Sequence, residues 1–179
     1  MKNKKTVWLS VFRNVVPADY EIWLEQLAMQ GWNIDQIGQW SSVAMTFHRS
    51  EPKKYRYIYD LKACPKKEYK STYEQFGWEL VGQMASCFIW RKEYTDKRPE
   101  SFTNHESLEK RNKQVISAVS VSFIMFLIVS IVLITDFIIT FSNLSTSSIV
   151  QFILGTVLSF AFTLYLGYVM KKIYNNRLK

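Results

Sequence analysis

Two long apolar runs near the C-terminus constrain the fold of this 179-residue chain more than any other feature. Residues 115–135 carry no charged side chain, and neither do residues 149–170. A helix of about 20 apolar residues crosses the hydrocarbon core of a bilayer and satisfies its own backbone hydrogen bonds there. The sequence therefore predicts a hairpin of two transmembrane helices within residues 115–179.

The basic residues that flank the two runs predict their orientation. The first run follows Lys110, Arg111 and Lys113, and the tail after the second run holds four basic residues: Lys171, Lys172, Arg177 and Lys179. The loop between the runs contains no Lys or Arg. Because cytoplasmic flanks of membrane helices are enriched in these residues, we expect both termini in the cytoplasm.

Small residues recur at intervals of four along the second run, as Gly155, Ser159, Thr163 and Gly167. Such a row lets two helix backbones approach closely. The simpler expectation is that the row packs against the first run. A homodimer through the transmembrane helices, or docking with a membrane partner, is the alternative.

The N-terminal part of the chain repeats a short pattern. "GWNIDQIGQ" begins at Gly31 and "GWELVGQ" begins at Gly77. Each glycine suits the left-handed position that ends a helix. Strand and helix patterns flank both motifs in the same order. Strands are expected at residues 6–13, 33–39, 42–49, 55–61, 79–84 and 86–93, and helices at 17–30 and 65–76.

This order predicts an α+β fold made of two βαββ units in tandem within residues 1–92. One antiparallel sheet with both helices on one face would be ferredoxin-like, and the alternative is two halves that close toward a barrel. We expect residues 93–114 to be a linker and juxtamembrane helix. Residues 1–98 have 16 basic and 11 acidic residues, a charge of +5 that suits a domain near anionic lipid.

Few residues point to chemistry. The cysteines Cys64 and Cys87 are far apart and no histidine cluster accompanies them, so no metal site is expected. The sequence contains no glycine-rich phosphate loop and no nucleophile elbow, so we expect neither a cofactor nor catalysis. Direct nucleic-acid binding is not expected either, since the basic-aromatic-glycine signature of RNA-binding sheets is missing.

The aromatic content of the first hundred residues predicts a binding surface instead. Some aromatic side chains should lie on a sheet face away from the helices, where an apolar ligand or a partner can bind. Charged residues near strand ends can assist, although Asp60 and Arg91 can equally form a structural ion pair. The candidate binding residues are Trp8, Phe12, Arg13, Tyr57, Asp60, Trp90 and Arg91.

Several motifs together resemble a bacterial domain-of-unknown-function family, DUF2812. They are "FR" at Phe12–Arg13, "DYEIWLEQLAMQGW" from Asp19 to Trp32, "YRYIYD" from Tyr55 to Asp60, "YEQFGWELVG" and "FIWRK". The resemblance covers about residues 7–92. It implies a trailing pair of membrane helices and genes that lie beside those of PadR-like repressors, and it implies no catalytic residues.

These observations predict a regulatory or sensory protein anchored in the bacterial inner membrane. Its cytosolic α+β domain would bind a PadR-like transcription regulator or a small ligand. Two alternatives stay open: a membrane-bound enzyme with an aromatic pocket, and an accessory or immunity subunit of a membrane complex.

Overall fold

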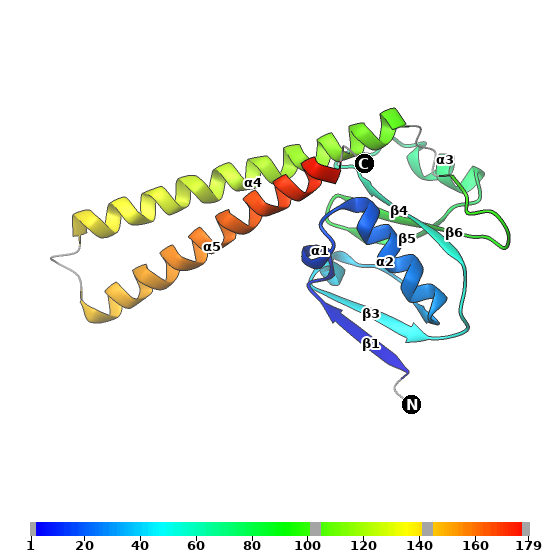
Figure 1. Cartoon of the computed structure of the whole chain (residues 1–179), viewed down its shortest axis with the longest axis horizontal. Helices are drawn as coiled ribbons and strands as arrows, with labels where there is room; N and C mark the ends of the chain where they lie inside the picture. The colour runs from blue at the N-terminus through cyan, green and yellow to red at the C-terminus, as the bar shows by residue number, and fades with distance from the viewer. Residues whose placement is uncertain (1–2, 101–104, 141–144, 177–179) are drawn as a thin grey trace. The chain divides into compact units, whose positions relative to one another are not determined.

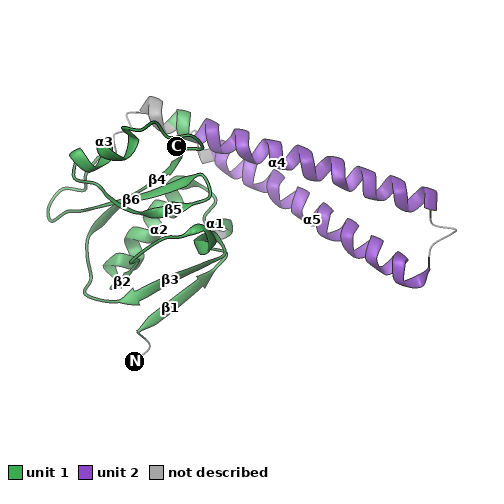
Figure 2. Ribbon diagram, turned by 180° about the vertical axis from the view of Figure 1, so that it is seen from behind, with its two compact units in different colours: residues 1–111 green, residues 112–179 purple. Residues whose placement is uncertain are grey.

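The computed structural model describes residues 3–100, 105–140 and 145–176, without the side chains of Arg13 and of residues 105–108 and 176. The basic tail residues Arg177 and Lys179 lie outside the described residues. The chain forms two compact units, residues 1–111 and residues 112–179 (Figure 2). The first is a mixed α/β unit, and the second consists of two long apolar helices.

The first unit contains the predicted pair of βαββ repeats (Figure 1). The first repeat consists of β1 (Lys4–Trp8), α2 (Pro17–Met29), β2 (Trp32–Asn33) and β3 (Ala44–Arg49). The second consists of β4 (Tyr55–Leu61), α3 (Tyr69–Gln75), β5 (Glu79–Met84) and β6 (Cys87–Glu93). Each repeat forms its own antiparallel three-stranded sheet with the last strand in the centre, in the orders β1-β3-β2 and β4-β6-β5. The matching orders confirm the repeat.

The repeated glycines have the predicted conformation. Gly31 follows the end of α2 with φ of 78°, and Gly77 follows the end of α3 with φ of 74°. The two adjacent tryptophans differ in environment. Trp32 is half-buried beneath the cations of Lys5 and Arg49, whereas Trp78 is buried in the core.

The chain does not form the expected single sheet with both helices on one face. The strands make two sheets, and α2 and α3 cover opposite faces of the second one. Tyr57 and Ile89 belong to a core that α2 shares, whereas Ile58, Phe88 and Trp90 belong to a cluster that includes α3 residues. Because β4 and β6 carry large apolar side chains on both faces, each face has to be covered.

The first strand is shorter than residues 6–13. It ends at Trp8, because Leu9 adopts a left-handed conformation with φ of 53°. The short helix α1 (Ser10–Arg13) follows. The segment after β2 likewise leaves the sheet and forms the 3-10 helix η1 (Gln39–Ser42) before β3 begins.

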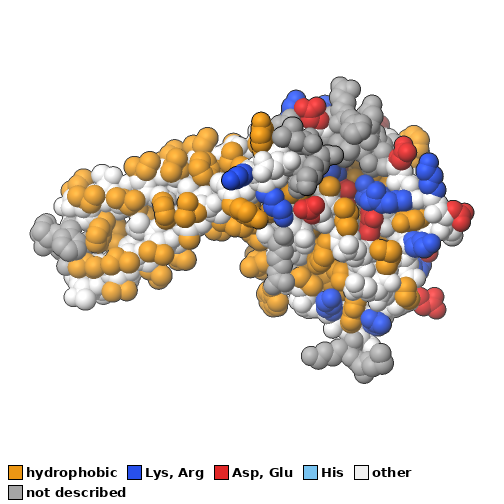
Figure 3. Space-filling model, viewed as in Figure 1, with side chains coloured by type: hydrophobic (Ala, Val, Ile, Leu, Met, Phe, Trp, Pro, Cys, Tyr) orange, Lys and Arg blue, Asp and Glu red, His pale blue; other side chains and the backbone are white. Residues whose placement is uncertain are grey.

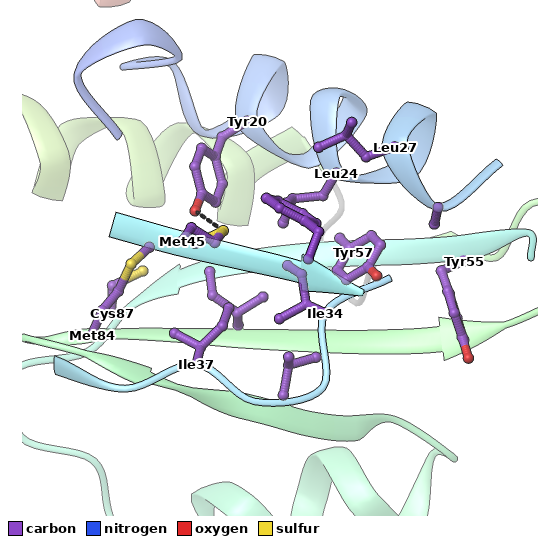
Figure 4. Close-up of a cluster of buried hydrophobic side chains, with 14 residues drawn as sticks. Tyr20, Leu24, Leu27, Ile34, Ile37, Met45, Tyr55, Tyr57, Met84 and Cys87 are labelled. Carbon is purple, nitrogen blue, oxygen red and sulfur yellow. Dashed lines mark hydrogen bonds between the residues drawn. The ribbon is translucent and has the colours of Figure 1, made fainter. Parts of the chain in front are cut away.

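The main core lies between α2 and the two sheets. Figure 4 shows Tyr20, Leu24 and Leu27 pointing from α2 toward Met45 on β3 and Tyr57 on β4. All five side chains are at most 5% exposed. Since both repeats contribute to one core, neither sheet buries its inner face alone.

Gly82 joins the two sheets at a close approach. Ile37, between β2 and η1, forms a parallel bridge with Gly82, and its N–H donates to the Val81 carbonyl at 3.0 Å. A Cβ atom at Gly82 would overlap the backbone of Ile37, whereas one at Gly38 would meet no atom within 4 Å. Only glycine therefore fits at position 82.

The second unit contains most of α4 (His105–Thr140) and all of α5 (Thr146–Asn176). Segments Glu109–Thr140 and Thr146–Asn175 are long and apolar enough to cross a membrane. Hydrophobic side chains are spread along the visible surface of both helices (Figure 3). These features are consistent with a two-span membrane protein, with helices that extend beyond the apolar runs at both ends.

Three of the four small residues of α5 contribute to packing within the hairpin. The Ser159 hydroxyl lies 2.7 Å from the Ser130 hydroxyl of α4, and the Thr163 side chain is buried one turn later. A Cβ atom at Gly167 would lie 3.5 Å from a ring carbon of α4, whereas one at Gly155 would meet no atom within 4 Å. The row therefore faces α4 from Ser159 onward, and Gly155 is left open.

Candidate functional site

Two carboxylates and three guanidinium groups form a cluster inside the first unit, which we call the buried ion network. Its members are Glu21, Glu25, Arg56, Arg98 and Arg111. Four of the five residues are at most 8% exposed, and Arg98 lies at the rim. Charged side chains are rarely buried to this extent unless they are paired. The contacts within the network therefore decide whether the unit can bury these charges.

Every carboxylate oxygen of the network accepts from at least one guanidinium group. Glu21 Oε1 accepts from Arg111 Nη1 at 2.6 Å, and its Oε2 accepts from both Nη atoms of Arg56 at 3.2 Å. Glu25 Oε1 accepts from Arg56 Nη1 at 2.8 Å and from Arg98 Nη2 at 3.0 Å. Glu25 Oε2 accepts from Arg98 Nε at 3.1 Å. Arg56 thus bridges the two carboxylates.

The same carboxylates cover the free edge of the second sheet. β4 is an outer strand, and the N–H groups of Tyr59 and Tyr57 donate to Glu21 at 2.9 Å and to Glu25 at 3.4 Å. Residues four apart on a helix are separated by about 6 Å along its axis. This spacing nearly matches the distance of about 6.8 Å between alternate residues of a strand. α2 therefore satisfies an edge that would otherwise be open to pairing with another chain.

The segment expected to be a linker supplies two of the three arginines. Arg98 follows β6, and Arg111 is the last residue of the first unit, one turn of α4 before the apolar run that starts at residue 115. This network was not predicted from the sequence. The available signal was the pair Glu21 and Glu25, one turn apart, each directly after a core position, Tyr20 or Leu24.

The structure does not bring the seven candidate binding residues together. Tyr57 is buried in the main core, and Trp90 is buried in the cluster beside α3. Trp8 and Phe12 are exposed near α1, and the side chain of Arg13 lies outside the described side chains.

Asp60 is the acceptor of a tyrosine cluster on α3. Its Oδ2 accepts from the Tyr69 hydroxyl at 2.7 Å and the Tyr73 hydroxyl at 3.2 Å, and the Tyr69 hydroxyl accepts from Trp90 Nε1 at 3.1 Å. The Tyr73 ring stacks on Trp90 with centroids 4.5 Å apart. Burial, reinforced by the Asp60 carboxylate, raises the pKa of both tyrosines. The hydroxyls therefore stay protonated and act as hydrogen-bond donors near neutral pH.

Arg91 pairs with Glu79 rather than with Asp60. Its Nε and Nη2 donate to the two Glu79 oxygens at 2.8 and 2.7 Å, and its Nη1 donates to the Ile34 carbonyl at 2.7 Å. The guanidinium group also lies over the Tyr55 ring, 5.0 Å from its centroid. Arg91 holds the pKa of Glu79 below its ordinary value. It therefore links the second sheet to the chain that follows β2.

Exposed apolar side chains gather where β1, α1 and η1 meet, and we call them the aromatic patch. Its members are Trp8, Leu9, Phe12, Trp40 and Val43, which are between 37% and 81% exposed. The N–H of Leu9 donates to the Val43 carbonyl at 2.7 Å, and the N–H of Val43 donates to the Trp40 carbonyl at 3.0 Å. These bonds bring two segments that are distant in sequence onto one surface.

Candidate metal ligands do not assemble in the part of the chain that the structure describes. No group of three or more His, Cys, Asp or Glu side chains there is placed to hold a metal ion. Cys64 is exposed, whereas Cys87 is buried, and burial raises the pKa of its thiol.

A family relationship follows from comparison with known sequences. The profile of a family described as "Protein of unknown function (DUF2812)" matches residues 17–126. The chain belongs to the DUF2812 family. In this DUF2812 protein the matched region begins at the first residue of α2 and contains all five members of the buried ion network. No curated protein and no solved structure matched the chain.

Proposed function

We propose that this DUF2812 protein is a regulatory protein of the bacterial inner membrane, with both termini in the cytoplasm. In this proposal α4 and α5 cross the membrane, and residues 1–111 bind a PadR-like transcription regulator. The buried ion network transmits changes in α4 to the α/β unit. The observation that carries the proposal is the contact between Arg111 and Glu21.

Arg111 is suited to couple the two parts of the chain because of its position. It is the last residue of the α/β unit, and the apolar run of α4 begins at residue 115, one turn further along the same helix. Its partner Glu21 also binds Arg56 and the edge of β4. A rotation of α4 that withdrew Arg111 would therefore alter the charge balance at the sheet edge.

The energy of such a change is large enough to switch a protein between two states. Removing one partner from a buried ion pair costs about 3–5 kcal/mol, because the other charge is left uncompensated. Coupling free energies of about 1–3 kcal/mol are typical of allosteric proteins. Even a partial loss of the Arg111–Glu21 contact is therefore sufficient to bias the α/β unit.

The engagement of the other polar groups supports binding rather than catalysis. Asp60 accepts from Tyr69 and Tyr73, and Arg91 is paired with Glu79. A general acid, base or electrophile has to reach its substrate, whereas these groups are occupied by neighbours within the unit.

The test uses the full chain co-expressed with a PadR-like repressor and a reporter gene that this repressor controls. We expect the repressor to co-purify with the detergent-solubilised chain and reporter output to change when the chain is present. Arg111→Met should abolish the reporter change while the chain stays in the membrane fraction. Lys110→Met removes the same charge from the exposed neighbouring residue and should have no effect.

Two results would contradict the proposal. If the wild-type chain neither retains the repressor nor alters the reporter, the regulatory pairing is wrong. If Arg111→Met and Lys110→Met both behave as wild type, the network does not transmit the signal.

A further inference from the structure

The aromatic patch has properties that the buried ion network does not explain. We propose that this patch docks on anionic lipid headgroups and holds the α/β unit against the bilayer. This docking rests on the membrane attachment proposed above, and it adds a second, reversible contact with the membrane.

The two tryptophans of the patch differ from the other tryptophans of the chain. Trp40 is 81% exposed and Trp8 is 62% exposed, whereas Trp78 and Trp90 are buried. Large aromatic side chains seldom stay in water together with neighbouring aliphatic ones unless they form a contact surface. The indole ring is suited to the headgroup region of a bilayer, because its ring is apolar and its N–H donates a hydrogen bond.

The backbone at Leu9 keeps this surface exposed. Successive residues of a strand point to opposite faces, so the residue after exposed Trp8 would normally turn inward. Leu9 instead adopts a left-handed conformation, with φ of 53° and ψ of 42°, and stays 47% exposed. A strained conformation that exposes an apolar side chain is more readily explained by binding than by folding.

The charge of the contributing segments favours an anionic surface. Residues 1–18 contain four basic residues and no Asp or Glu, and residues 36–48 contain no Lys, Arg, Asp or Glu. Basic residues near anionic lipid gain attraction that falls off within a Debye length. Lys4 and Lys5 lie on β1, the strand that ends at Trp8. The patch therefore combines apolar side chains that insert with basic residues on the same strand that attract the headgroups.

The distribution of tryptophan gives a direct assay. All six tryptophans lie within residues 1–111, and residues 112–179 contain none. Bromine atoms on lipid acyl chains quench tryptophan only on contact. When the full chain is incorporated in nanodiscs, quenching therefore reports on the α/β unit and not on α4 or α5.

The experiment compares nanodiscs of phosphatidylcholine with nanodiscs that also contain phosphatidylglycerol, each with ordinary or brominated acyl chains. In the anionic discs we expect brominated lipid to remove up to about one third of the emission, since two of six tryptophans lie in the patch. The loss should be smaller in phosphatidylcholine discs. It should disappear in Trp8→Phe/Trp40→Phe and persist in Trp78→Phe.

Matched charge reversals test the electrostatic attraction. Lys4→Glu is expected to weaken the quenching in anionic discs, and Lys66→Glu, at an exposed site outside the patch segments, should leave it unchanged. Equal quenching in these two variants would contradict the role of the basic residues on β1.

Several results would overturn the docking. Emission that is equal in brominated and ordinary anionic discs would show that no tryptophan reaches the acyl chains. Quenching that survives in Trp8→Phe/Trp40→Phe would place the contact elsewhere. Absent quenching with concentration-dependent dimers in detergent would assign the patch to a second copy of the chain. A chain that does not co-elute with nanodiscs would instead refute the membrane attachment itself.

Discussion

Glu21→Gln should destabilise the α/β unit far more than an amide substitution at an exposed ion pair. The Glu21 side chain is 3% exposed and accepts hydrogen bonds from Arg56, Arg111 and the N–H of Tyr59. Glutamine keeps the size of the side chain, but it removes the charge and replaces one acceptor oxygen by an NH₂ group that faces a guanidinium donor. Loss of one partner from a buried pair predicts about 3–5 kcal/mol, a large share of the roughly 5–15 kcal/mol of a typical domain.

Urea unfolding of the full chain in detergent measures this loss, because tryptophan emission reports only on residues 1–111. Glu79→Gln is the matched control, since Glu79 pairs with Arg91 but is 62% exposed at the side chain. Exposed pairs contribute roughly 0–1 kcal/mol. If the two variants have the same free energy of unfolding, the buried ion network does not stabilise the α/β unit.

Three further sets of variants test other parts of the structure. Gly82→Ala should lower the free energy of unfolding by about 1–3 kcal/mol, because the new Cβ atom overlaps neighbouring backbone. Gly38→Ala is the control, since its Cβ atom meets no other atom within 4 Å. In the same urea titration it should change the free energy of unfolding by less than about 0.5 kcal/mol. Because burial raises the pKa of Tyr73, the folded state holds this proton more tightly, so stability should fall as the pH rises above about 10, and less steeply in Tyr73→Phe. Cysteines placed at Ser130 and Ser159, in a chain without its native cysteines, should oxidise within one chain, and a dimer band on a non-reducing gel would contradict the hairpin packing.

The elements of the α/β unit follow from local patterns, and for that reason they could be predicted. Residues 55–61 and 79–84 form strands with the predicted bounds, and α2 begins at Pro17 as predicted. The two Gly-Trp motifs identify the helix ends because a left-handed residue leaves a strong compositional signal.

The division into two sheets could not be predicted from the same patterns. Strand periodicity shows which residues share a face, but it does not show which strands pair. In β4, the apolar Ile58 on the face opposite Tyr57 was the only local sign that both faces are buried.

The buried ion network was missed because its residues resemble a solvated surface. Glutamates one turn apart on a helix are usually exposed, and only tertiary packing places Glu21 and Glu25 beside the edge of β4. Their arginine partners lie 31 to 90 residues away, so no local spacing relates them. The aromatic patch was missed in part for a similar reason. Leu9 adopts a left-handed conformation, but the sequence has no glycine at this position from which that conformation could be predicted.

The proposed location of the α/β unit on the cytoplasmic side of the membrane is tested most directly by labelling Cys64 in whole cells. Cys64 is exposed, whereas Cys87 is buried and its raised pKa keeps the thiol protonated, so a membrane-impermeant maleimide has one reactive site in the folded chain. We predict no labelling of intact cells, full labelling after permeabilisation, and retention of the chain in membranes washed with alkaline carbonate. Labelling of Cys64 in intact cells, or release of the chain by carbonate, would contradict a cytoplasmic unit held by two membrane spans.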